Sequence, residues 1–188
     1  MENKEIKAII ALLDDPDREV VEVVSDTLLK KGVEAIPELE KAWENTLDER
    51  IQERLEDIIQ QIQFNTAKQN LLSWIKTGAE YILEGAFFVS QFQYPDIKFE
   101  KIDAEIEKIR KDIWLEINNN LTALEKVRIL NYFIFDMYRF SRNQADFYSP
   151  HNCYLNKVIE TRKGNPISLS IIYLAVSYKL GLPIYGVN

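Results

Sequence analysis

The segment from Asn165 to Pro183 restricts the fold of this chain more than any other, because it specifies both ends of one helix. Asn165 is a favourable N-cap, and Pro166 suits the first helical position, where the missing N–H of proline would have no partner. A mostly apolar run follows, and Gly181 and Pro183 end it. Apolar residues on nearly every side predict a helix that is buried among other elements. The final segment, LPIYGVN, is expected to begin a strand.

Net charge and cysteine content exclude several classes of partner and compartment. The formal net charge of −7 disfavours nucleic acid and anionic membranes, since binding to both depends on Lys and Arg. The single cysteine cannot form an internal disulfide, which fits a reducing compartment. The segment MENKEIKAII lacks the apolar stretch of a signal peptide, and no uncharged run approaches the roughly 20 residues of a spanning helix. We therefore expect a soluble, cytoplasmic protein without a nucleic-acid or membrane partner.

Helical patterns dominate the first third of the chain. Residues 3–64 predict two helical hairpins with a period of about 30 residues, as in stacked helical repeats. Asp15 is expected to cap the second helix and Gly32 to end it. Thr46 and Glu49 have the spacing of a capping box, which would start the fourth helix.

This repeated segment is similar to a known repeat family and defines the first of two predicted domains. The pattern LLDDPDREVVEVVSDTLLKKG resembles a HEAT repeat. Two repeats alone leave an open apolar face, so they are expected to pack on another part of the chain. The polar segment NTAKQN, residues 65–70, is the expected junction. The predicted domains are therefore a HEAT-like segment, 1–66, and a second domain, 67–188.

The second domain is also predicted to be helical, so the fold class expected for the chain is mainly all-α. Its segments indicate one or two buried helices over 70–95, with Gly78 and Gly85 as bends or close contacts, and an amphipathic helix with Phe99 and Ile113 on its apolar face. The segment LTALEKVRILNYFIFDMYRF opens with the spacing of a capping box, Thr122 to Glu125, and predicts a central helix. The segment SRNQADFYSPHN is expected to be a loop, and no strand with clean alternation precedes Ile184.

Three segments of the second domain together resemble a known family. These are EGAFFVSQFQYPDI, NQADFYSPHNCYLNKVIETRKGNP and RKGNPISLSIIYLAVSYKLGLPIYGVN, which occur in order over residues from about 70 to 188. They are similar to the transglutaminase-like superfamily, and most similar to its Sir B-type branch of bacterial proteins. The resemblance implies the helical half of an α+β, papain-like domain, truncated before its core sheet is complete.

The resemblance also implies where chemistry would take place. In the family, a cysteine at the start of the helix gains thiolate character from the helix dipole, and an acid-oriented histidine from a later strand takes its proton. In this chain the nucleophile position falls on Pro166, within a degenerate site formed by Gly164, Asn165, Pro166 and Ser168. The family's histidine and acid positions follow the helix, and the chain ends at Asn188 before either. No catalytic residue is therefore expected in this site.

Other candidate residues were weighed against ordinary structural roles. His151 and Cys153 are the only residues of their types and lie two positions apart, so a Cys–His dyad is an alternative to the commoner interpretation, an ordinary loop pair. One His and one Cys fall short of the three or four ligands of a metal site, so no metal or cofactor is expected. Ser168 and Ser170 have no base in view and are expected to cap or pack the helix.

Two charged pairs were also considered. Glu80 and Glu84 are one helical turn apart, so they could act as an acid–base pair, although a solvated edge is the commoner role. Arg162 and Lys163 precede the cap and could recognise an acidic partner, although solvated side chains are the simpler interpretation.

The function expected from these features is a non-catalytic, transglutaminase-like regulatory or protein-binding scaffold, a pseudoenzyme with an unidentified protein partner. The alternative is a cysteine-dependent amide-processing enzyme, a protease or a transferase, with its remaining catalytic residues beyond this chain. A purely solenoid binding module is a third possibility. The truncated edge, an unfinished strand beside an apolar helix, is expected to cause self-association.

Overall fold

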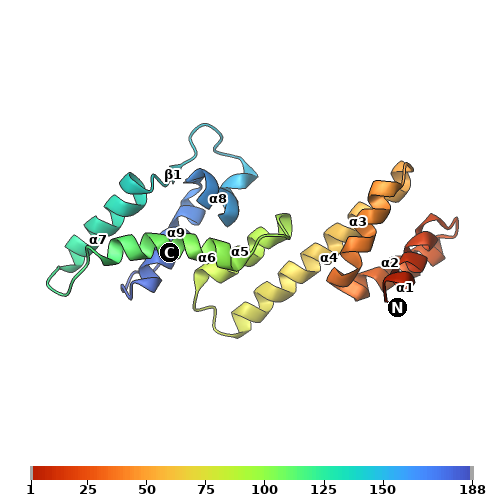
Figure 1. The fold of residues 1–188 in the computed structure, drawn as a ribbon, viewed down its shortest axis with the longest axis horizontal. Coiled ribbons are helices and arrows are strands. Elements are labelled where there is room, and N and C mark those ends of the chain that lie inside the picture. Colours follow the sequence, from red (N-terminus) through yellow and green to blue (C-terminus); the bar gives the residue numbers. More distant parts are fainter. Residues whose placement is uncertain (1, 187–188) are drawn as a thin grey trace. The chain divides into compact units, whose positions relative to one another are not determined.

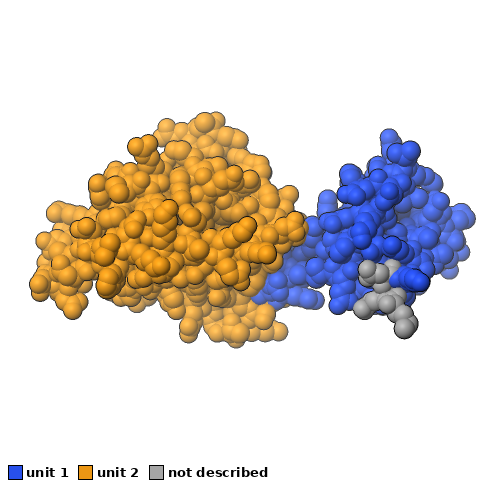
Figure 2. All heavy atoms as spheres, in the orientation of Figure 1, with its two compact units in different colours: residues 1–70 blue, residues 71–188 orange. Residues whose placement is uncertain are grey.

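The computed structural model of the protein describes residues 2–186. The chain divides into two compact units, residues 1–70 and 71–188 (Figures 1 and 2). Helix α4, Glu49–Lys76, runs through the boundary between them. The predicted junction at 65–70 therefore lies inside a helix, because NTAKQN contains neither proline nor glycine and its residues tolerate helical geometry.

Unit 1 consists of short helices that surround one apolar core. In order they are α1 (Glu2–Ala11), the 3₁₀ helix η1 (Leu12–Asp14), α2 (Arg18–Lys31), the 3₁₀ helix η2 (Gly32–Ala35), α3 (Ile36–Asn45) and the first part of α4. The core takes one stripe from each element: Ile6, Leu13, Val24, Leu28, Ala35, Leu39, Leu55, Ile58 and Ile62. The predicted helices are present, and Gly32 ends α2 with a positive φ of 65° as expected.

Two helix starts in unit 1 differ from the prediction. Helix α2 is capped by Asp17, which accepts a hydrogen bond from the N–H of Glu19, and not by Asp15. Asp15 instead accepts a hydrogen bond from the N–H of Asp17, so it stabilises the turn before the cap. Several acidic residues in succession each offer a capping oxygen, and the backbone geometry of the turn selects one of them.

The start of α4 shows the same kind of shift. Thr46 ends α3, so the predicted capping box with Glu49 does not form. The carboxylate of Asp48 accepts a hydrogen bond of 2.9 Å from the N–H of Arg50. It also pairs with the guanidinium of Arg50, and this hydrogen bond is the main reason that the pKa of Asp48 is lowered. Asp48 therefore takes the capping role predicted for Thr46.

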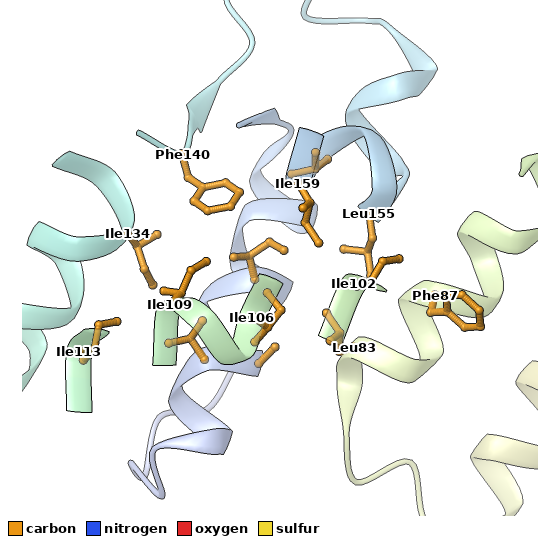
Figure 3. Packing of buried hydrophobic residues seen from close by; sticks show 14 of the residues in the cluster. Leu83, Phe87, Ile102, Ile106, Ile109, Ile113, Ile134, Phe140, Leu155 and Ile159 are labelled. Carbon is orange, nitrogen blue, oxygen red and sulfur yellow. The ribbon is translucent and has the colours of Figure 1, made fainter. Parts of the chain in front are cut away.

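Unit 2 is built around α9, the helix that the sequence specified most fully. Its elements are α5 (Ile82–Gln93), α6 (Phe99–Trp114), α7 (Ala123–Asn131), the π-helix η3 (Tyr132–Met137), β1 (Ser141–Arg142), the 3₁₀ helix η4 (Pro150–Cys153), α8 (Leu155–Thr161), β2 (Lys163–Gly164) and α9 (Pro166–Lys179). Side chains from α5, α6 and α8 meet around α9 (Figure 3). Helix α6 contributes the predicted apolar face, with Ile102, Ile106, Ile109 and Ile113 buried.

Helix α9 is buried on one side only. Ile172, Ala175 and Val176 are fully buried, whereas Ile167 is 71% exposed and Tyr178 is 54% exposed. Apolar residues on most sides predicted a helix surrounded by other elements. Within the described residues, other elements cover only one face of α9.

The segment 121–140 was predicted to be a central helix; it is helical over residues 123–137, but it is not buried on most sides. It forms α7 and then η3, and the capping box between Thr122 and Glu125 is present as predicted. Only Leu130, Ile134 and Phe140 of its large apolar residues are fully buried. The exposed ones are Leu124, Tyr132, Phe135 and Met137. Apolar composition indicated burial, but it did not indicate which neighbours would cover each face.

The only sheet among residues 2–186 has two very short strands. β1 and β2 pair in parallel, with Ser141 opposite Lys163 and Arg142 opposite Gly164. The sequence predicted a loop at the position of β1 and no strand at the position of β2. Residues 182–186 are not in a strand, in contrast to the predicted strand LPIYGVN, whose last two residues lie outside the described part of the chain.

The helices were also examined for membrane-spanning character. None of the helices within residues 2–186 combines the length and the apolar composition needed to cross a bilayer.

Candidate functional site

The amino-terminal end of α9 is closed by a reciprocal capping box. The side-chain oxygen of Asn165 accepts a hydrogen bond of 2.8 Å from the N–H of Ser168, and the Ser168 hydroxyl accepts one of 3.1 Å from the N–H of Asn165. Pro166 occupies the first helical position, as predicted. The donors at this end that Asn165 and Ser168 engage are therefore not free to bind a substrate oxygen.

Asn152 fixes the preceding loop against this helix end. Its backbone carbonyl accepts hydrogen bonds from the N–H of Asn165 at 3.2 Å and from the hydroxyl of Ser168 at 2.7 Å. Ser168 is 2% exposed, and its hydroxyl is engaged as donor and acceptor. This serine is therefore a structural residue, as the sequence suggested.

The side chain of Asn152 is buried as well, and sequence reasoning did not identify it. Its amide nitrogen donates to the carbonyl oxygens of Asp146 at 2.8 Å and Phe147 at 3.0 Å, and its oxygen accepts from Asn143 at 2.9 Å. A loop asparagine flanked by turn formers was the available signal. Its role as the link between loop and helix depends on contacts that are distant in sequence.

Gly164 is required by the closeness of its neighbours. It is buried, and a Cβ at this position would lie 2.5 Å from the hydroxyl oxygen of Ser168 and 3.1 Å from a methyl group of Val158. No larger residue fits without displacing the serine that closes the helix. Gly164, Asn165, Pro166 and Ser168, which the sequence grouped as one site, are thus brought together.

Cys153 also lies at this helix end. Its sulfur is exposed and accepts a hydrogen bond of 3.1 Å from the side-chain nitrogen of Asn165. His151, two residues earlier, contacts a different element, since its Nδ1 lies 2.8 Å from the hydroxyl oxygen of Tyr94. Within the described residues the thiol and the imidazole have separate partners, so the structure does not pair them.

The remaining candidates have structural contacts. Ser170 donates to the carbonyl of Pro166 at 2.7 Å, within its own helix. Arg162 has a left-handed φ of 58°, and its guanidinium binds Glu105 at 2.9 Å and lies 4.9 Å from the ring centroid of Phe140. It is therefore a packing residue and not a solvated one.

The two basic residues before the cap thus differ in their surroundings. Lys163 is exposed and donates to the hydroxyl of Ser141 at 2.5 Å, next to the strand pair. Ser141 and Lys163 are also opposite each other in the sheet.

Glu80 and Glu84 are not on one helix face as the sequence suggested. Glu80 precedes the N-cap Tyr81, and Glu84 lies in the first turn of α5. Both line a cavity next to Trp74. Among residues 2–186, no group of three or more His, Cys, Asp or Glu side chains is arranged to hold a metal ion.

The sequence of the region around this helix end was compared with known families. Residues 100–188 match the model of the transglutaminase-like superfamily. The transglutaminase-like match covers α6, the loop that Asn152 anchors and the capped start of α9. It agrees with the resemblance drawn from the sequence at the level of the superfamily.

Similar proteins occur in bacteria and in mammals. A UPF0162 protein of Xylella fastidiosa is 31% identical over 119 residues, which are 63% of this chain and 42% of the relative. F-box only protein 21 of Mus musculus is 30% identical over 146 residues, covering 63% of this chain and 23% of the relative. A UPF0162 protein of Pasteurella multocida is 37% identical over 73 residues, covering 39% of this chain and 28% of the relative.

The chain thus spans less than half the length of the curated relatives it matches. No solved structure matches it.

Proposed function

We propose that residues 67–188 are a non-catalytic transglutaminase-like domain, a pseudoenzyme of the Sir B-type branch that binds another protein in the cytoplasm. The observation that carries this proposal is Pro166 at the first position of α9, where the family resemblance places the nucleophile. Proline has neither a thiol nor a hydroxyl. The neighbouring hydroxyl of Ser168 is buried and already bonded to Asn152, so it does not replace a nucleophile.

The same proposal assigns unit 1 a binding role. Its helices α1 to α4 follow one another through short connections and share one apolar core, which supports a HEAT-like array over residues 1–66. Helical repeats of this kind present extended surfaces to other proteins. The names of the relatives, UPF0162 protein and F-box only protein 21, denote no reaction.

The test of this proposal is a search for turnover in the whole chain. The protein is incubated with casein and a fluorescent primary amine, and both amide hydrolysis and amine incorporation are followed. We expect rates equal to the uncatalysed background for the wild type and for Cys153→Ser. A rate above background that disappears in Cys153→Ser would overturn the proposal.

One observation favours the alternative, a cysteine-dependent protease or transferase whose remaining groups come from a longer protein. The exposed sulfur of Cys153 lies at the amino-terminal end of α9, beside Asn165. An exposed thiol at this position is accessible to a substrate. The same turnover experiment decides between the two functions, because only the alternative predicts a loss of activity in Cys153→Ser.

We also propose self-association through the apolar surface beside the end of α9. Leu174, Leu182 and Ile184 line an open cavity of about 620 Å³ there, and the adjacent Tyr185 is 79% exposed. Exposed apolar patches of this kind are often covered by association. Sedimentation velocity over a series of concentrations tests this. A single monomeric species up to the highest concentration would contradict it.

A further inference from the structure

A second, more polar cavity lies where the end of α4, the start of α5 and the end of α9 meet. Its volume is about 400 Å³. Its walls include the aromatic residues Trp74, Tyr81 and Tyr178 and the carboxylates of Glu80 and Glu84. The turn that joins α4 to α5 is yellow-green in Figure 1. The acidic pair that the sequence singled out therefore lines this open cavity, with Glu84 half-buried and Glu80 exposed.

The aromatic walls are held in place. The rings of Tyr81 and Tyr178 are stacked, with centroids 5.2 Å apart and planes at 28°. The hydroxyl of Tyr81 donates to Asp103 at 3.0 Å. The ring of Trp74 lies against Gly85, so close that a Cβ at Gly85 would be 2.6 Å from it. A ligand would thus meet ordered ring surfaces at little further entropic cost.

The charge in this cavity is negative and uncompensated. Lys179 lines it too, but its ammonium is bound by Asp103 at 2.9 Å and lies 3.8 Å from Glu107. Within residues 2–186, Glu80 and Glu84 have no ion pair. Half-buried Glu84 therefore has no cationic partner among these residues, and a bound ligand could supply one.

The protonation of Tyr81 reflects the same surroundings. Burial raises the pKa of its hydroxyl well above the usual value, and the negative charges of Asp103, Glu107 and Glu84 raise it further. The carboxylates that contribute to this shift, unlike burial itself, also favour a cation nearby.

The indole N–H of Trp74 provides another unmatched group in the same wall. It is buried and has no hydrogen-bond acceptor among the described residues. Buried donors are rarely left unpaired in native proteins.

We propose that this cavity binds the arginine side chain of a partner protein. A guanidinium can stack on the exposed ring of Tyr178 and donate paired hydrogen bonds to Glu80 and Glu84. Arginine suits both contacts better than lysine, because its planar group stacks and donates in a fork. The net charge of −7 also favours a basic partner. This inference rests on the proposed protein-binding function and specifies which segment of the partner is recognised.

The experiment is a titration of the whole chain with N-acetyl-arginine amide, followed by the indole N–H resonances of the three tryptophans. Trp74→Phe assigns the signal of Trp74. N-acetyl-citrulline amide, which has the same shape without the charge, is the matched ligand. We expect the Trp74 signal to shift with arginine amide and to need at least about tenfold more citrulline amide for the same shift.

Two double variants locate the binding. Glu80→Gln with Glu84→Gln keeps the shapes of both side chains and should weaken arginine binding about tenfold or more. Glu100→Gln with Glu116→Gln changes the net charge by the same amount at two exposed positions away from the cavity and should leave binding unchanged. Equal binding of arginine and citrulline, or equal binding by both double variants, would overturn the inference.

Two further outcomes separate this inference from other interpretations. If the Trp74 signal shifts with the concentration of the protein and not with that of arginine amide, a second copy of the chain occupies the cavity. This result would overturn the inference. Turnover that depends on Cys153 would refute the proposed non-catalytic function, whereas a titration without any shift refutes only the arginine site.

Discussion

The indole ring of Trp74 packs directly on Gly85, linking the end of α4 to the first turns of α5. A Cβ at Gly85 would lie 2.6 Å from two ring carbons, far inside van der Waals contact. Gly85 is fully surrounded, and its φ is not in the left-handed region, so the glycine is needed for space and not for backbone geometry. This contact positions one wall of the proposed arginine site.

We expect Gly85→Ala to destabilise the protein by up to about 2 kcal/mol. Overpacking against a ring costs about 1–3 kcal/mol, from which the gain of roughly 1 kcal/mol that alanine normally brings to a helix is subtracted. Urea unfolding measures the change. Gly186→Ala is the matched control, since nothing lies within 4 Å of its added Cβ. Adding Trp74→Leu to Gly85→Ala should recover part of the lost stability. Equal stability of Gly85→Ala and Gly186→Ala would contradict this packing argument.

The closed helix end predicts a difference between two serines. We expect Ser168→Ala to cost about 1–3 kcal/mol, because its buried hydroxyl accepts from Asn165 and donates to the carbonyl of Asn152. Ser170→Ala is the control, with an expected change below about 0.5 kcal/mol, since its exposed hydroxyl bonds only to a carbonyl of its own helix. Urea unfolding of both variants checks this. Similar losses would mean that the capping box contributes little.

Local signals in the sequence were sufficient to predict the helix ends that depend on nearby residues. The capping box at Thr122 and the N-cap at Asn165 needed only residues within one turn, and both are present. The shift from Thr46 to Asp48 shows where this reasoning fails. Neighbouring side chains there competed for one role, and the choice depended on how the preceding helix ended.

Contacts between distant segments were not predictable in the same way. The strand pairing of Ser141 with Lys163 joins residues 22 positions apart. The hydrogen bond from Asn165 to Cys153 depends on a loop anchored by buried Asn152. Turn formers predicted that this segment would be a loop, but its path depends on hydrogen bonds that no periodic pattern encodes.

The stability of unit 1 should depend on pH through Glu38. Its side chain is 4% exposed and pairs with Lys41 at 3.0 Å and Lys7 at 3.5 Å. The hydrogen bond from Lys41 is the largest cause of a lowered pKa, and the charges of both lysines contribute. A carboxyl whose pKa is lower in the folded state stabilises it above the unfolded value of 4.5, and this contribution is lost as the pH falls through the folded pKa.

We therefore expect Glu38→Gln to reduce stability at pH 7 and to have a smaller effect at pH 3. Urea unfolding followed by circular dichroism at both pH values measures the difference. Glu44→Gln, an exposed carboxylate on the same helix without an ion pair among the described residues, is the control and should show no such dependence. An equal effect of Glu38→Gln at the two pH values would show that the lysine pairing does not stabilise the fold.

The last prediction concerns the residue on which the proposed function depends. If the helix end keeps the electrostatics of a nucleophile site and lacks only the nucleophile, Pro166→Cys in a Cys153→Ser background should carry a thiol with a pKa below the ordinary value of about 8.5. The positive end of the helix dipole stabilises the thiolate there. The rate of alkylation by iodoacetamide as a function of pH gives this pKa. Ser170→Cys, one turn further along α9 in the same background, is the matched control, because the dipole effect weakens beyond the first turn. Equal pKa values at the two positions would mean that this helix end does not activate a thiol, and the assignment of Pro166 to a lost nucleophile position would then lose its physical basis.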